Sequence, residues 1–151
     1  MQHTIYILII GLVLISCKSE KITTNEQVSI INSVIDSALL FDSALNTRDY
    51  WIDFSNTGQF ESQAIKDFLK QRVNFVQINA DSLLKNDSTW IQYGFLKKML
   101  INFRKVDLRG DSLIIDLDKI KATDGSNGLQ IILKKENNHY KVMSSKMTWI
   151  S

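Results

Sequence analysis

The sequence predicts one small α+β domain in which N-terminal helices pack on a curved four-stranded antiparallel meander. Three observations predict this fold class. Apolar residues recur at helical spacing through the first half of the chain, and they alternate with polar residues after about Phe103. The segments between these runs are rich in Gly, Asn, Asp and Ser, which are typical of turns.

The first 16 residues predict a secretion signal. Ile5 to Ile15 is an almost entirely apolar run, shorter than the roughly 18 residues that a membrane-spanning helix needs. The run ends in Leu14-Ile15-Ser16-Cys17, which resembles the lipobox of bacterial lipoproteins. The resemblance implies cleavage before Cys17, a diacylglycerol on its thiol and an acyl chain such as palmitate on its new amine.

Lipidation predicts where the protein resides. Cys17 is the only cysteine, so the mature domain has no disulfide and no thiolate metal site. Two or more lipid chains anchor a protein stably to a membrane. Lys18 follows Cys17, where some bacteria read an Asp as an inner-membrane retention signal, so the outer membrane is expected. The predicted parts are the signal (1–16), the lipidated Cys and short tether (17–23) and one domain (24–151).

Three helices are predicted in the first half. Thr23 with Glu26, or Thr24 with Gln27, fits a capping box at the first helix start. An aromatic segment, Asp49 to Phe54, predicts a short strand or an ordered loop. The helices are expected from about Thr24 to Asn46, from about Glu61 to Leu84, and from Asp87 or Ser88 through Leu100.

The second half predicts four strands joined by three turns. Arg109-Gly110-Asp111 matches a cell-adhesion tripeptide, but it stands where a hairpin needs its turn, and the turn interpretation is preferred. The other turns are expected at 124–128 and 136–138. A bulge near Ser144 would bring four residues of the last strand onto one face: Tyr140, Val142, Met147 and Trp149.

The order of helices followed by a meander resembles the NTF2-like (cystatin-like) superfamily. The resemblance rests on the closing hairpin, 129–135 and 139–150, in which Tyr140-Lys141-Val142 begins the final strand. The resemblance implies helices on one side of the sheet and a cone on the concave side. In that superfamily the cone holds a small apolar ligand, an active site or nothing.

The chemistry-bearing residues are few. The mature chain keeps all 18 basic and all 16 acidic residues without clustering them, which argues against nucleic-acid binding. His139 is its single histidine, expected to be exposed beside a turn, so a multi-histidine metal site is excluded. Asp116 and Asp118 face the same way on a strand, where solvated acids are expected. We therefore predict no catalytic residue, no metal and no cofactor.

The aromatic segment is the candidate contact for a ligand or partner. Its aromatic and acidic residues could line the mouth of a pocket, or could instead close the core where helix meets sheet. The residues concerned are Tyr50, Trp51, Asp53 and Phe54. The sequence favours a non-enzymatic binding or interaction domain with a protein partner or a small apolar ligand. The alternatives are a small NTF2-like hydrolase or isomerase and an immunity-type protein that neutralises a toxin.

Overall fold

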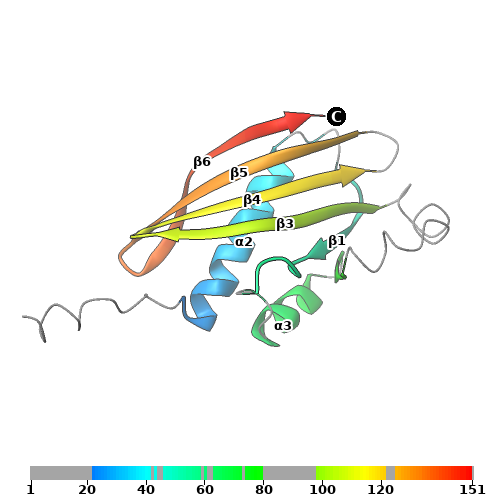
Figure 1. The fold of residues 1–151 in the computed structure, drawn as a ribbon. Helices are drawn as coiled ribbons and strands as arrows, with labels where there is room; N and C mark the ends of the chain where they lie inside the picture. Colours follow the sequence, from blue (N-terminus) through cyan, green and yellow to red (C-terminus); the bar gives the residue numbers. More distant parts are fainter. Residues whose placement is uncertain are drawn as a thin grey trace, which may run out of the picture.

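The computed structural model describes residues 22–41, 43, 46–58, 60, 63–72, 74–79, 98–121 and 125–150. Within these ranges the chain forms two helices and six strands (Figure 1). In chain order they are α2 (Thr24–Leu40), β1 (Asp49–Asp53), α3 (Gln63–Gln71), β2 (Phe75–Gln77), β3 (Lys98–Arg109), β4 (Ser112–Lys121), β5 (Gly125–Glu136) and β6 (His139–Ile150). The predicted signal, Cys17 and most of the tether lie outside the described residues.

The strands form one six-stranded mixed sheet in the order β2-β1-β3-β4-β5-β6. Strand β1 is parallel to both of its neighbours, β2 and β3, whereas the pairs from β3 to β6 are antiparallel. The predicted four-stranded antiparallel meander is therefore wrong. Short strands from the helical half of the chain join the sheet at one side and make it mixed.

Helix α2 begins as predicted and ends early. The Thr23 side chain and Glu26 form a capping box, which satisfies free N–H groups of the first turn. The helix stops at Leu40 because Phe41 is extended, six residues before the predicted end at Asn46. Asn46 donates to the Leu39 carbonyl at 2.7 Å, and the buried Lys119 ammonium donates to the Phe41 carbonyl. These bonds satisfy carbonyl groups at and just beyond the helix end.

The predicted second helix is half right. Helix α3 ends at Gln71, and Phe75–Gln77 forms β2 rather than continuing the helix. The backbone pairs with β1 instead: the Tyr50 N–H donates to the Asn74 carbonyl at 2.8 Å and the Ile78 N–H to the Ile52 carbonyl at 2.9 Å. Strand β1, helix α3 and strand β2 thus form a β-α-β unit. Of the predicted third helix, Met99 and Leu100 belong to β3, and residues 80–97 lie outside the described part.

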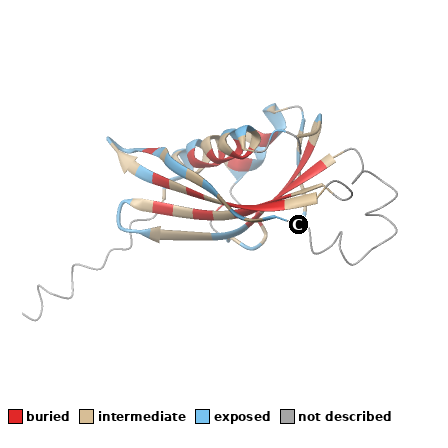
Figure 2. Ribbon diagram, turned by 90° about the horizontal axis from the view of Figure 1, so that it is seen from above, coloured by how far each residue is buried: buried red, intermediate tan, exposed pale blue. Residues whose placement is uncertain are grey.

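The main core lies between the two described helices and one face of the sheet. Figure 2 shows buried positions along α2 and along the strands beneath it. Five residues of α2 are buried against Ile, Leu and Phe side chains of β1 and β3–β5. On the opposite face of the sheet, Trp51 and Leu100 form a second, small cluster with Ile78 and Ile120. Strand alternation explains this division, because successive side chains point to opposite faces.

Strand β6 has two irregularities, and the predicted single bulge does not suffice. The register shifts opposite Ile132 and Leu133, and again opposite Gly128 and Leu129. Met147 pairs with Leu129, whose side chain faces the core, but Trp149 pairs with Gly128 on the other face. The second shift therefore returns Trp149 to the helix-free face, and the prediction of all four residues on one face is wrong for Trp149.

Candidate functional site

The aromatic segment forms β1 and the residue after it. Tyr50 stacks on Phe75 with ring centroids 4.8 Å apart, and burial raises the pKa of its hydroxyl. Phe54 is fully buried and lies 4.7 Å, centroid to centroid, from Phe103. Both side chains therefore contribute to the main core. These aromatic side chains pack where the helices meet the sheet.

Trp51 lies on the other face of the sheet. Its side chain packs with Leu100, and the Lys98 ammonium lies 5.4 Å from the centroid of its ring. This distance allows a cation–π contact between the ammonium and the indole. Trp51 is only 8% exposed. The structure thus separates Trp51 from Tyr50 and Phe54, although the three are close in sequence.

Asp53 is the predicted site residue that borders a cavity. It ends β1, its side chain is fully buried, and its Oδ1 accepts the Ser55 N–H at 2.8 Å. This bond makes an Asx-type turn, which directs the chain away from the strand end. A buried carboxylate is costly unless hydrogen-bonded. Because this buried carboxylate lies at the rim of a cavity, this end of β1 is a candidate functional position.

The cavity lies at the carboxyl ends of the parallel strands β1 and β2, beside α3, and encloses about 590 Å³. Crevices at the carboxyl ends of parallel strands are the usual ligand sites of open α/β sheets, since the connecting segments diverge there. We call it the strand-end cavity. Its described lining residues are Asp53, Ser55, Lys66, Leu69, Lys70, Phe75, Val76, Gln77, Ile78 and Asn79.

The lining combines an apolar part with charged groups. Leu69 and Phe75 supply apolar surface. Lys66 and Lys70 are four residues apart on α3 and therefore share one face of the helix. Lys70 pairs with Asp67 at 3.2 Å. The Gln63 amide and then Lys70 hold the pKa of the Asp67 carboxyl below its usual range. The cavity therefore suits a small amphipathic molecule with an anionic group near the two lysines.

Most of this lining was not predicted from the sequence. No role was assigned to the two lysines, and Phe75 to Asn79 lie inside the predicted second helix. One observation could have found them. Lys66 and Lys70 are four residues apart and Leu69 is three residues after Lys66, which is an arrangement that also suits the wall of an amphipathic pocket.

A second cavity of about 640 Å³ lies between the start of α2 and the β5–β6 turn. Lys135 and Glu26, whose charged atoms are 3.1 Å apart, both line it, as does the exposed His139. Hydrogen bonds from the Thr23 N–H and hydroxyl, aided by Lys135, hold the pKa of Glu26 below its ordinary value. The cap and the ion pair thus satisfy Glu26. His139 lies at a turn, as predicted, and borders the second cavity rather than the strand-end cavity.

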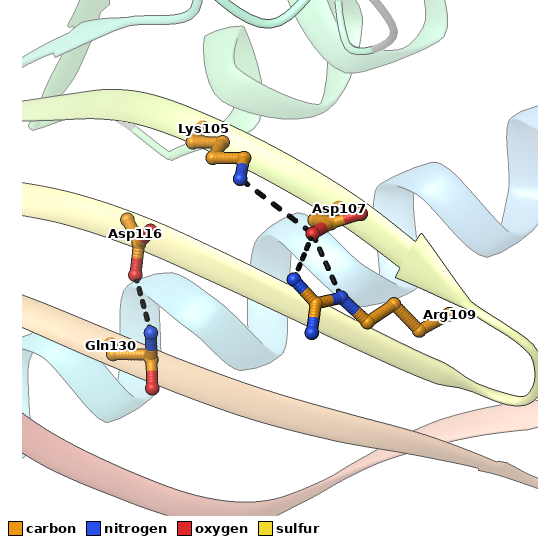
Figure 3. A network of polar contacts seen from close by, with 5 residues as sticks. All are labelled: Lys105, Asp107, Arg109, Asp116 and Gln130. Carbon is orange, nitrogen blue, oxygen red and sulfur yellow. Dashed lines mark hydrogen bonds and ion pairs between the residues drawn. The ribbon is translucent and has the colours of Figure 1, made fainter.

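The helix-free face of the sheet carries a network of polar contacts (Figure 3). Asp107 accepts two bonds from Arg109, at 2.8 and 2.9 Å, and lies 3.6 Å from the Lys105 ammonium. Arg109 first, then Lys105, lowers the pKa of Asp107. Asp116 accepts a bond from the Gln130 amide at 2.9 Å. The first three residues lie along β3, and the bond between Gln130 and Asp116 joins β5 to β4.

Asp118 departs from the sequence prediction. It faces the same way as Asp116 but is only 7% exposed, so the expectation of two solvated acids is wrong for this residue. Burial raises its pKa, against the lowering effects of Arg104, whose Nε lies 3.0 Å away, and of the Trp149 hydrogen bond. Both carboxylates thus have structural partners: Asp118 contacts a cation and an indole, and Asp116 accepts from an amide. They do not form an open acid–base site.

Within the described ranges, no group of three or more His, Cys, Asp or Glu side chains is arranged to hold a metal ion. In the same part of the chain, no helix is both long and apolar enough to cross a membrane. No protein-family model, curated protein or solved structure matches this chain.

Proposed function

We propose that this protein is a lipid-anchored lipoprotein of the bacterial cell envelope whose domain works by binding a ligand or partner at the strand-end cavity. The proposal has two parts that can be tested separately. The anchor is supported by the sequence around Cys17, and the binding role is supported by the composition of the cavity.

The anchor part rests on the apolar run and the lipobox-like tetrad that ends in Cys17. The proposed mature protein begins at Cys17, is held in a membrane by lipid chains, and resides in the outer rather than the inner membrane. Lys18 after the Cys supports this choice of membrane. The membrane is then one partner, and the domain stands in the aqueous phase outside the cytoplasm.

The observation that carries the binding part is the strand-end cavity itself. It combines a buried acid, apolar walls and two cations of α3 in about 590 Å³, within the usual size of small-molecule sites. Ligand pockets are mostly apolar with a few placed polar groups. The ligand class that fits is a small amphipathic molecule, or a side chain of a protein partner with the same character.

Binding is favoured over catalysis by what surrounds Asp53. General acid–base chemistry uses a second titratable group within hydrogen-bond reach of the same reacting atoms. Among the described lining residues, Asp53 is the one acid, and no His or Cys accompanies it. His139 lines the other cavity. The described geometry therefore supports a recognition site more directly than a reaction centre.

The first experiment tests the anchor. The variant Cys17→Ala should lose lipid labelling and should accumulate as uncut precursor, because the lipid-accepting thiol is gone. Metabolic labelling with a radioactive fatty acid and mass spectrometry of the mature N-terminus measure both effects. Cleavage after Ser16 in the variant, or a wild-type mature protein without lipid, would overturn this part of the proposal.

The second experiment tests the cavity. The fluorescent probe 1-anilinonaphthalene-8-sulfonate combines an apolar ring system with an anion and should bind the purified folded domain there. Lys66→Ala with Lys70→Ala should weaken this binding several-fold while leaving the thermal midpoint close to wild type, because both lysines are exposed. Lys146→Ala, an exposed lysine on β6, is the matched control and should bind the probe like wild type.

Two results would contradict the binding proposal. Equal probe affinity in the double variant, the control and wild type would show that the cavity is not the site. A turnover assay in which Asp53→Asn abolishes activity at an unchanged thermal midpoint would replace binding with catalysis. His139→Ala should leave probe binding unchanged, since this residue borders the other cavity.

A further inference from the structure

Three segments that are distant in sequence meet at one end of the domain. They are the start of α2 at Thr23, the β3–β4 turn at Gly110 and Asp111, and the β5–β6 turn at Asn137 and Asn138; we call them the turn end. The Lys135 N–H donates to the Asp111 carbonyl at 2.8 Å, which joins the two hairpins. The Lys135 ammonium lies 3.1 Å from Glu26, which joins them to α2.

The other end of the domain is well separated from the turn end. Helix α2 has 17 residues and is therefore about 25 Å long at 1.5 Å per residue. Just beyond its C-terminus, the Phe41 carbonyl accepts from Lys119, near the far end of β4. Strand β6 runs from the turn end at His139 to Ile150. Leu40 and Ile150, 85% and 74% exposed, thus mark the end opposite the turn end.

The proposed lipid attachment point is close to the turn end along the chain. Cys17 precedes Thr23 by six residues. Six residues span at most about 20 Å even when fully extended. The reach of the tether is therefore shorter than α2. The start of α2 cannot move far from a membrane that holds Cys17.

We infer that the turn end lies against the headgroups of the membrane that holds the Cys17 lipid, with the Leu40 and Ile150 end directed away from it. This inference rests on the lipid anchoring proposed above. It assigns an interaction surface, the turn end, and its partner, a phospholipid headgroup layer. It also orients the domain on the membrane.

The charges at the turn end suit this surface. Four cations are each matched by an acid: Lys135 by Glu26, Lys134 by Asp111, Lys141 by Glu136 and Arg109 by Asp107. The paired groups present no net charge to the phosphates. Of the four large apolar residues exposed in the described ranges, Leu40 and Ile150 lie at the other end, and Val76 and Met143 lie on β2 and within β6. None of the four belongs to the turn end, which therefore offers polar groups suited to the headgroup layer rather than to the hydrocarbon core.

The orientation also sets the distance between the strand-end cavity and the membrane surface. Strand β1 runs parallel to β3, and Asp53 pairs with Asn102. Strand β3 continues seven residues beyond Asn102 to Arg109 at the turn end. At about 3.3 Å per residue, the carboxyl end of β1 is roughly 23 Å from the tip of β3. The cavity would therefore meet its ligand or partner well clear of the headgroups.

The test places one fluorophore at a time on the lipidated full-length protein. Because the mature chain has no cysteine besides the lipidated Cys17, single thiols can be introduced and labelled with a maleimide dye. Arg109→Cys and His139→Cys report on the two hairpins, and Leu40→Cys and Ile150→Cys are matched exposed positions at the opposite end. The protein is reconstituted in phosphatidylethanolamine and phosphatidylglycerol vesicles that carry a headgroup nitroxide quencher.

The expected result is several-fold stronger quenching at Arg109 and His139 than at Leu40 and Ile150. The contrast should persist in high salt, because the tether rather than net charge imposes the orientation. Equal quenching at the four positions, or stronger quenching at Leu40 and Ile150, would overturn the inference even though the protein floats with the vesicles. A protein that fails to float with the vesicles at all would instead overturn the proposed anchor.

Discussion

At the scale of single residues, one glycine determines how the end of β6 meets the sheet. Gly128 pairs with Trp149, and the indole occupies the space where a side chain at Gly128 would stand. A Cβ built on Gly128 would lie 2.0 Å from the indole Nε1 and 2.5 Å from the Thr148 Oγ1. The indole in turn bonds Asp118, so the glycine makes room for the network on the helix-free face.

We expect Gly128→Ala to destabilise the domain by about 1–3 kcal/mol, because the indole must leave its place to accommodate the new methyl group. Chemical denaturation measures the free energy of unfolding, and tryptophan fluorescence reports the displaced indole. The double variant Gly128→Ala with Trp149→Ala is the control. In the Trp149→Ala background the added methyl should cost less, because only the close contact with the Thr148 Oγ1 is left. An undiminished cost in that background would show that the indole is not what requires glycine at position 128.

At the scale of elements, Arg72 connects α3 to α2. Its guanidinium donates to the Asn32 side chain at 2.6 Å and to Asp36 at 2.9 Å, both on α2. The guanidinium carbon, Cζ, also lies 5.5 Å from the Phe68 ring centroid and 5.6 Å from the Phe75 ring centroid. A planar guanidinium can bond two acceptors and stack on rings at the same time, which an ammonium cannot do. Arg72 therefore fixes α3, and with it one wall of the strand-end cavity.

Arg72→Lys should cost about 1–2 kcal/mol of stability, since the lysine loses one of the two bonds and the stacked geometry. Arg72→Ala should cost more. The control is Lys70→Ala on the same helix, whose ion pair with Asp67 is exposed and should be worth less than about 1 kcal/mol. The measurement is the denaturation midpoint of each variant. An Arg72→Lys protein as stable as wild type would show that the charge alone suffices.

Elements differ in how well the sequence predicts them. The capping box at Thr23 and Glu26 involves residues only three positions apart, so the start of α2 could be predicted from the sequence alone. The β3–β4 turn could be predicted equally well, because its Gly110 has a φ of +60°, a conformation that only glycine adopts freely. Strand β2 is three residues long, and its apolar residues also fit helical spacing. Nothing local identifies it, because its hydrogen bonds are made to β1, more than twenty residues earlier.

The residues of the candidate site also differ in how far the sequence predicts them. Asp53 could be singled out from its setting among aromatic residues, and the structure places it beside a cavity. Trp51 and Tyr50 could not be assigned to opposite faces until β1 was known to be a central strand with both faces covered. The second register shift in β6 likewise depends on Gly128, a residue of the neighbouring strand. Where a side chain's role depends on partners distant in sequence, it can be assigned only once the tertiary structure is known.

At the scale of the whole molecule, the described contacts that build the core lie within residues 22–150. The main cluster draws on α2, α3 and β1–β6, and Ile22 is the first residue that packs against it. The proposed signal and the first five residues of the proposed tether, 17–21, precede that point, whereas Ile22 and Thr23, which were assigned to the tether, belong to the folded domain. This division predicts that the domain is a folding unit independent of its membrane anchor, since a core of this size needs no lipid or disulfide to be stable.

Truncation at the N-terminus tests whether the domain folds independently of its anchor. A chain starting at Ser19, made without signal or lipid, should unfold in one cooperative transition when followed by circular dichroism and calorimetry. A chain starting at Val28 should melt several degrees lower, because it loses Ile22 from the core, the Thr23–Glu26 capping box and the Glu26–Lys135 ion pair. Loss of a helix cap alone costs about 1 kcal/mol. If the chain starting at Ser19 shows no cooperative transition, residues before Ser19 are needed for the fold. Equal midpoints for the two chains would show instead that the first turn of α2 contributes nothing to the stability of the domain.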